Sequence, residues 1–285
     1  MVVGDPALHR ATRAFLNRRS LLLKLAAVAT AAGGTYLLLR PGQVDPKQVA
    51  ARAAVIDQAY GVRIGYGDPA SFYVPPYGPR DAIIPDGHAT AAAPADVALA
   101  LDAIAQSLAV YPPGFYASLC KAIFLCGTLR FGNEAAGGTY GPAWIILAAD
   151  PSVGAGGIRE TARLGVHHEF SSLVLKRAPL IEMRWRMLMP ADWEPDPTND
   201  QALRHDGGAN VQEGFLSSYG ATSLENDFNT YAETAFANPE RLIALAQDDP
   251  VIRTKAALLL EAYAAHDPRI MQTYRKLGLN RIASA

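Results

Sequence analysis

The chain has 285 residues, of which 50% are hydrophobic, 26 are Lys or Arg and 27 are Asp or Glu. This apolar fraction supports a buried core of ordinary size and excludes an intrinsically disordered chain. The charges nearly cancel, so the chain has no basic field that would attract a nucleic-acid backbone, and no nucleic acid is expected as a partner. Cys120 and Cys126 flank the start of an expected strand, too far apart for a disulfide, so we expect two free thiols.

A candidate membrane segment lies near the N-terminus. Residues 20–39 carry a single charge, Lys24, and about twenty apolar residues are enough for a helix to cross the hydrocarbon core. The flank before this segment contains Arg10, Arg13, Arg18 and Arg19. By the positive-inside rule, residues 1–19 form a cytoplasmic basic tail and the chain after Arg40 is exported. We therefore expect a single-pass protein of the bacterial inner membrane whose C-terminal domain lies in the periplasm or outside.

The same segment has a second interpretation. Arg18-Arg19-Ser20 resembles a twin-arginine export signal, which would make residues 20–39 a signal peptide. No small-residue cleavage site precedes a polar stretch, because residues 36–39 are aromatic or aliphatic. We favour an uncleaved signal-anchor over a cleaved peptide, and over a buried core helix because the flanking charges are so one-sided.

The region after the anchor divides into an arm and a domain. Residues 46–60 have helical character, and the Gly/Pro/Tyr-rich run that follows has little periodicity, so residues 40–93 are predicted to be a linker or wrapping arm. The later elements are expected as a helix, two strands, a helix and a helical C-terminal region, at 94–108, 121–131, 142–148, 157–176 and 225–277. Breaks in the last region are expected near Pro239, Pro250 and Pro268. Strands before helices predict an α+β domain over 94–285.

A short motif in the 157–176 helix points to metal chemistry. His168-Glu169 is the opening of H-E-x-x-H, in which two histidines one turn apart bind zinc and the glutamate is the general base on a zinc-bound water. Four residues after His168, however, stands Ser172, whose neutral hydroxyl is a poor zinc ligand. His167 does not simply replace the missing imidazole, because adjacent helix positions point about 100° apart. Alone, a His-His-Glu motif on a helix is more often structural or accidental than catalytic.

The surrounding motifs resemble one family, the zinc-binding metallopeptidases of the gluzincin type, from about residue 94 to 240. The resemblance rests on Tyr111-Pro112-Pro113-Gly114, the 121–131 strand, residues 136–141 leading into Trp144-Ile145-Ile146-Leu147, His167 to Ser172, Trp185 to Pro190, Ser217-Ser218-Tyr219-Gly220, and residues 224–233. It implies a zincin-like domain with a small mixed sheet and an active-site helix. It also implies an exposed edge strand, assigned to 144–147, that pairs with an extended peptide substrate.

The resemblance also implies roles for single residues. Glu169 would be the general base and His168 a zinc ligand, and Tyr219 would stabilise an oxyanion or else simply pack. A further ligand would come from the helix after residue 224. The alignment leaves that ligand open between Glu225, reached with a one-residue offset, and the asparagines Asn226 and Asn229.

Two further observations bear on the ligand set. Glu225, Asn229 and Glu233 recur every four residues, so they share one helix face, either as a ligand with supporting residues or as a solvated acidic face. His205, in a polar loop, is the best candidate to replace the missing imidazole, followed by His167.

The sequence therefore supports two functions and leaves open whether the protein is an enzyme. The first is a membrane-anchored envelope metallopeptidase, a zinc-dependent hydrolase acting on peptides or proteins. The alternative is an inactive pseudo-peptidase with a zincin fold, which has lost zinc and binds a peptide or an envelope partner. A site with one imidazole holds zinc weakly, which weighs against the first function.

Overall fold

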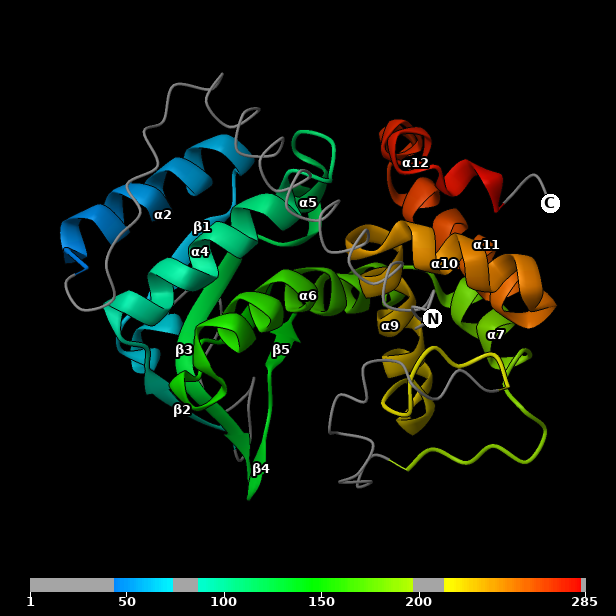
Figure 1. Cartoon of the computed structure of the whole chain (residues 1–285), viewed down its shortest axis with the longest axis horizontal. Coiled ribbons are helices and arrows are strands. Elements are labelled where there is room, and N and C mark those ends of the chain that lie inside the picture. Colours follow the sequence, from blue (N-terminus) through cyan, green and yellow to red (C-terminus); the bar gives the residue numbers. More distant parts are fainter. Residues whose placement is uncertain (1–43, 74–86, 197–212, 283–285) are drawn as a thin grey trace, which may run out of the picture. The chain divides into compact units, whose positions relative to one another are not determined.

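The sheet is organised around one long strand, β3 (Ala122–Phe131), in a computed structural model that describes residues 44–73, 87–196 and 213–282. β1 (Arg63–Tyr66) and β6 (Trp144–Ala148) lie parallel to the first half of β3, one on each side. The remaining strands, β2 (Gly87–Ala91), β4 (Glu134–Ala135) and β5 (Gly138–Gly141), are antiparallel to their neighbours. Over the described residues the sheet has six strands of mixed direction, which confirms the small mixed sheet of an α+β fold (Figure 1).

β5 forms one edge of the sheet. The prediction that residues 144–147 form this edge is wrong. β6 lies between β3 and β5 and all five of its residues are buried. The reason is a tight hairpin: Gly141 pairs with Trp144, so the chain reverses within two residues and the glycine-rich segment itself becomes a strand.

The two faces of the sheet are covered by different groups. Ile123 and Leu125 of β3 belong to the larger core, which the helices complete. Phe124 and Cys126, which alternate with them, belong to a smaller core on the other face with Phe72. This alternation follows from the two-residue period of a strand, and both faces are apolar because both are covered.

The first helices begin and end where the sequence predicts. α2 (Pro46–Tyr60) and α4 (Pro94–Leu108) each begin with proline, which is favoured in the first turn of a helix. The Asp45 carboxylate accepts a hydrogen bond from the backbone N–H of Lys47 at 2.9 Å and caps α2.

The segment predicted as an arm, 40–93, is in its described part built into the domain. It supplies α2, β1 and β2, and its side chains Val49, Ile56 and Val62 are buried in the main core. All described residues belong to one compact unit that begins at Val44.

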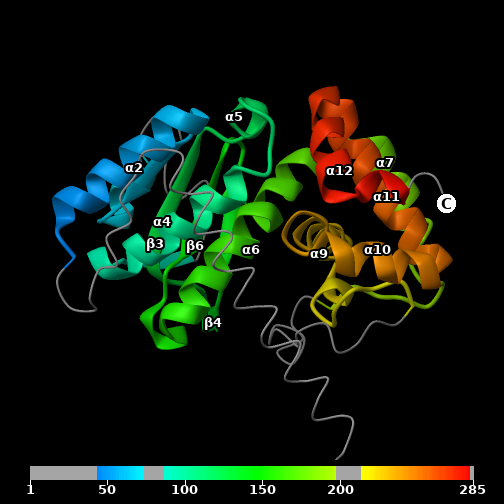
Figure 2. The ribbon, with the colours of Figure 1, turned by 45° about the horizontal axis from the view of Figure 1, so that its top comes forward.

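The long helix α6 (Gly154–Leu175) connects the sheet to the C-terminal helices. It packs on α4, β5, β6 and α9 (Leu224–Ala237), and Figure 2 shows it between α4 and α9. Gly165 permits the close approach to β6, since a Cβ at this position would lie 2.7 Å from the Cδ2 atom of Leu147. The helix predicted at 157–176 is confirmed, with a slightly earlier start.

The C-terminal half is helical. The remaining helices are α5 (Phe115–Leu119), α7 (Pro179–Arg186), α10 (Pro239–Asp248), α11 (Pro250–His266) and α12 (Met271–Leu277), with short 3-10 turns at Pro69–Tyr73, Pro151–Val153, Gly220–Thr222, Pro268–Ile270 and Leu279–Arg281. Pro239, Pro250 and Pro268 each open a helical element, which confirms the predicted breaks. The two cysteines are free and buried, also as predicted.

Several predictions fall on residues that the structure does not describe. Residues 1–19, the candidate anchor at 20–39 and His205 lie outside the described ranges. Within those ranges, none of the helices combines the length and the apolar character needed to span a membrane.

Candidate functional site

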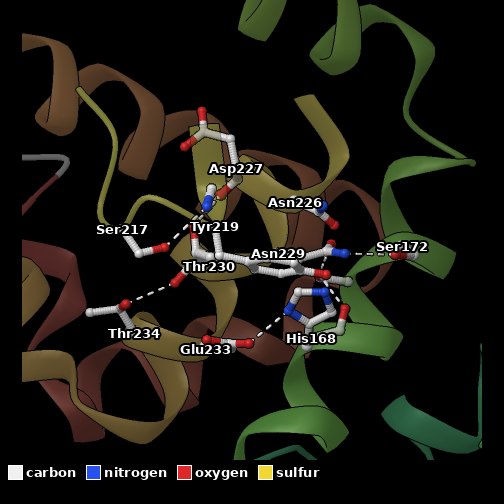
Figure 3. Close-up of polar contacts among 12 residues, drawn as sticks. His168, Ser172, Ser217, Tyr219, Asn226, Asp227, Asn229, Thr230, Glu233 and Thr234 are labelled. Carbon is white, nitrogen blue, oxygen red and sulfur yellow. Dashed lines mark hydrogen bonds and ion pairs between the residues drawn. The ribbon is translucent and has the colours of Figure 1, made fainter. Parts of the chain in front are cut away.

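Three polar pairs, which we call the polar ladder, join α6 to α9. The pairs, in order along α6, are His168 with Glu233, Ser172 with Asn229, and Lys176 with Glu225. The partners are four residues apart on both helices and their order is reversed, so the facing stripes run antiparallel. The first two pairs are visible in Figure 3.

The first pair combines the motif histidine with a carboxylate. The Nδ1 atom of His168 lies 2.6 Å from Oε1 of Glu233. Burial tends to lower the pKa of His168, but the hydrogen bond and charge of Glu233 and the nearby carboxylates outweigh it and raise the pKa above its usual value. Tyr219 lies alongside, with its ring centroid 5.6 Å from that of His168 (Figure 3). Because Nδ1 is engaged, Nε2 is the ring nitrogen left for a ligand.

The middle pair is neutral and fully buried. The Asn229 side chain donates a hydrogen bond to Oγ of Ser172 at 2.9 Å, and its carbonyl oxygen accepts a hydrogen bond from Ser171. Ser172 holds the position of the second histidine of H-E-x-x-H. Asn229 of α9 lies opposite it.

The third pair is more exposed. Nζ of Lys176 lies 3.1 Å from Oε2 of Glu225, and Tyr140 of β5 also hydrogen-bonds this carboxylate. Burial tends to raise the pKa of Glu225, but the hydrogen bonds from Tyr140 and Ser172 and the charge of Lys176 hold it below its usual value. Glu225, predicted as a ligand beside His168, therefore lies two helical turns away along the ladder.

Glu169 points away from the ladder towards the edge strand. A Cβ at Gly138 of β5 would lie 2.7 Å from Oε1 of Glu169, so only glycine lets the strand pass this close to the carboxylate. The side chain is buried, with a residue exposure of 7%, and forms no hydrogen bond or ion pair with any residue of the described ranges. Burial raises the pKa of Glu169 to about 7, with Glu225 and Glu233 adding to the effect and His168 opposing it.

The structure thus brings together three of the predicted site residues, His168, Glu169 and Tyr219. The four-residue spacing of the acidic residues on α9 identified the correct helix face, but Glu233 rather than Glu225 meets His168. Tyr140 was not predicted as a site residue. No signal in the sequence marked it, because its role follows from β5 being the sheet edge.

The described residues do not supply the ligand set of a catalytic zinc ion. Such a site needs three protein ligands around the metal. Here His168 offers one imidazole, whereas Ser172 and Asn229 are neutral and hydrogen-bonded to each other. In the part of the chain that the structure describes, no three or more His, Cys, Asp or Glu side chains are grouped so as to hold a metal ion.

Comparisons with known proteins give one distant likeness. No protein-family model matches the sequence, and no curated protein is significantly similar to it. One solved structure, titled as a "putative zinc-binding metallo-peptidase" from Bacteroides caccae ATCC 43185, aligns with a TM-score of 0.43 and 16% sequence identity, over 87% of this chain and 98% of that one. A likeness this small leaves the activity to be argued from the residues themselves.

Proposed function

We propose that this protein is a zinc-free pseudo-peptidase that binds an extended peptide or protein segment in the bacterial cell envelope. The middle pair of the polar ladder carries this proposal. A peptide bond is hydrolysed at a gluzincin site by a zinc-activated water, and that metal needs imidazole and carboxylate ligands where Ser172 and Asn229 stand. These two side chains instead satisfy each other and hold α6 against α9.

The edge strand supports the binding of an extended peptide. Among the described strands, β5 pairs only with β6, so its other side is a candidate for adding a further strand. Backbone hydrogen bonds would then hold the ligand, and the side chains below β5 would select it. Glu169 and Tyr140 are two of the side chains that would select the ligand.

One observation favours a second function, a zinc metallopeptidase of variant type. Metal-binding histidines commonly hold a carboxylate at their other ring nitrogen, and Glu233 does this for His168. Glu169 would then be the general base, Tyr219 would stabilise the oxyanion, and the further ligands would have to come from outside the polar ladder, with His205 as the candidate.

Metal analysis and peptide cleavage decide between the two functions. We expect the full-length protein, purified in detergent with added zinc, to contain far less than one zinc per chain, and to bind peptides without cleaving them. One zinc per chain that disappears in His168→Ala, together with cleavage that disappears in Glu169→Gln while zinc stays, would establish the enzyme instead.

We also propose that residues 20–39 anchor the protein in the inner membrane with the domain outside. The basic flank before the segment supports this orientation. A phosphatase that is active only in the periplasm should be active when fused after Ala285, and activity only of a cytoplasmic reporter would contradict the orientation. Export that survives replacement of Arg18 and Arg19 by lysine would favour a plain anchor over a twin-arginine signal.

A further inference from the structure

Glu169 is a buried carboxylate for which the described structure provides no partner. Its residue exposure is 7%, and it forms no hydrogen bond or ion pair with another described residue. Burying an unpaired charge is costly, so such a group is either neutralised or paired by something that enters the site.

The charges around Glu169 leave one negative charge uncompensated. Three carboxylates lie near enough to influence one another, those of Glu169, Glu225 and Glu233. Lys176 pairs with Glu225 and His168 pairs with Glu233, so each of these two carboxylates already has a cationic or hydrogen-bonding partner. Glu169 is the one carboxylate of the three that has no such partner, so one positive charge would complete the pairing.

The edge strand fixes the direction from which that charge would come. Residues directly opposite each other on neighbouring strands point to the same face of the sheet. A Cβ at Gly138 would point at the Glu169 carboxylate, so the residue of an added strand that lies opposite Gly138 directs its side chain to the same side. Neighbouring strands are about 4.8 Å apart, a span that a long side chain bridges easily.

We propose that a cationic group of a peptide ligand added beside β5, an ammonium or guanidinium, pairs with the Glu169 carboxylate below that strand. This inference rests on the proposed peptide-binding function. Tyr219, beside His168, is placed to add an aromatic surface to the cation site. The group could be a Lys or Arg side chain within the ligand or the amino terminus of a chain, since all offer the same chemistry.

Four matched peptides test the inference on the full-length protein in detergent. The first is an acetylated and amidated octapeptide of alternating Thr and Val with one central Lys. The second and third carry Arg or norleucine in place of Lys, and the fourth is the norleucine peptide with a free amino terminus. Norleucine keeps the length of the lysine stem and removes its charge. Binding is followed by fluorescence anisotropy of labelled peptides.

We expect the Lys or Arg peptide, or the peptide with a free amino terminus, to bind at least tenfold more tightly than the blocked norleucine peptide. Preference for a central cation identifies a side chain as the source, and preference for the free amino terminus identifies a chain end. Glu169→Gln should abolish the preference, so that the cationic peptides bind no more tightly than the blocked norleucine peptide does to the same variant. Glu240→Gln, the same charge change at an exposed position on α10, should preserve the preference. A thermal melt of each variant checks that it is folded.

Three outcomes would overturn the inference. If the blocked norleucine peptide binds as tightly as all the others, the cation site is absent and peptide binding stands. If Glu169→Gln keeps the preference, the cation is bound by a residue other than Glu169. If no peptide binds, the proposed function fails and the inference fails with it.

Discussion

Helix α9 carries charged residues on two sides, and the two sides use them differently. Towards α11 (Pro250–His266), Asp227 and Lys255 form an ion pair of 2.7 Å in which both side chains are completely buried. Trp185 donates a hydrogen bond to the same Asp227 oxygen at 2.8 Å, and Lys255 donates one to the Gly214 carbonyl at 3.0 Å. This buried ion pair is formed entirely from groups within the domain.

The side of α9 that faces α6 differs in one respect. Its polar ladder is partly open to solvent at the Lys176–Glu225 end, and next to it lies Glu169 with no partner among the described residues. Charges that find partners inside the domain hold helices together, whereas a carboxylate without such a partner is available to a ligand. Where a charge lies in the fold, on α9 or on the neighbouring α6, therefore matters less than whether the fold completes its pairing.

The largest expected effect comes from breaking the buried ion pair. Lys255→Met leaves Asp227 buried without its cation, and we expect the free energy of unfolding to fall by about 3–5 kcal/mol, measured by urea denaturation. Lys255→Met combined with Asp227→Leu should recover much of this loss, because the pair is then replaced by apolar groups. A single variant as stable as the wild type would show that the pair is not a structural element.

The next effect tests whether the middle pair of the ladder stands where zinc ligands belong. Ser172→His with Asn229→Glu places a second imidazole and a carboxylate beside His168, and we expect the double variant to bind about one zinc per chain. Zinc at 100 times its dissociation constant should then raise the free energy of unfolding by about 2.7 kcal/mol. Elemental analysis and urea denaturation with and without zinc measure both.

Two controls accompany the zinc variant. Ser172→His alone should bind zinc more weakly, because the carboxylate ligand is missing, and adding His168→Ala to the double variant should remove the metal. A double variant that is folded but takes up no zinc would show that the ladder does not mark former ligand positions.

A smaller effect separates the two adjacent histidines of α6. His167 is buried, and the Tyr111 hydroxyl lies 2.8 Å from its Nδ1 atom. Tyr111→Phe leaves this nitrogen without a partner, so we expect a loss of about 1–3 kcal/mol in the free energy of unfolding. Peptide binding should be unchanged, because His167 belongs to the core and not to the proposed binding site beside β5. Loss of binding without loss of stability would contradict this division.

The sequence predicts the helices of this fold better than its sheet. Prolines at positions 46, 94, 239 and 250 mark the first turns of four helices, and local chemistry is enough to place them. The short strands β1 and β2 have only four or five residues, too few for a recognisable period, so the sequence predicts an arm there. The sequence also predicts the wrong edge strand, because the Gly-Thr-Tyr-Gly segment of β5 carries no strand pattern and only the apolar segment of β6 does.

The site was predictable as a helix face but not as a set of contacts. The spacing of Glu225, Asn229 and Glu233 places them on one side of a helix, whatever the fold. Which of them meets His168 depends on the axial register of α9 against α6. That register is set by packing between residues distant in the sequence, which no local pattern records.

The smallest effect concerns the exposed end of the ladder. Lys176 and Glu225 form an ion pair whose lysine side chain is 58% exposed, and such pairs contribute about 0.2–1 kcal/mol because water screens the charges and two flexible side chains must be ordered. Lys176→Met should therefore lower the free energy of unfolding by less than 1 kcal/mol, with a smaller difference at high salt. The same variant removes a cation that compensates Glu225, so the surroundings of Glu169 become more negative and the Lys octapeptide should bind somewhat more tightly. Arg184→Met, which breaks the exposed Arg184–Glu261 pair elsewhere on the surface, is the matched control and should leave peptide binding unchanged. If Lys176→Met instead lowers the free energy of unfolding by several kcal/mol, this end of the ladder belongs to the structural core, like the buried ion pair, and not to the binding site.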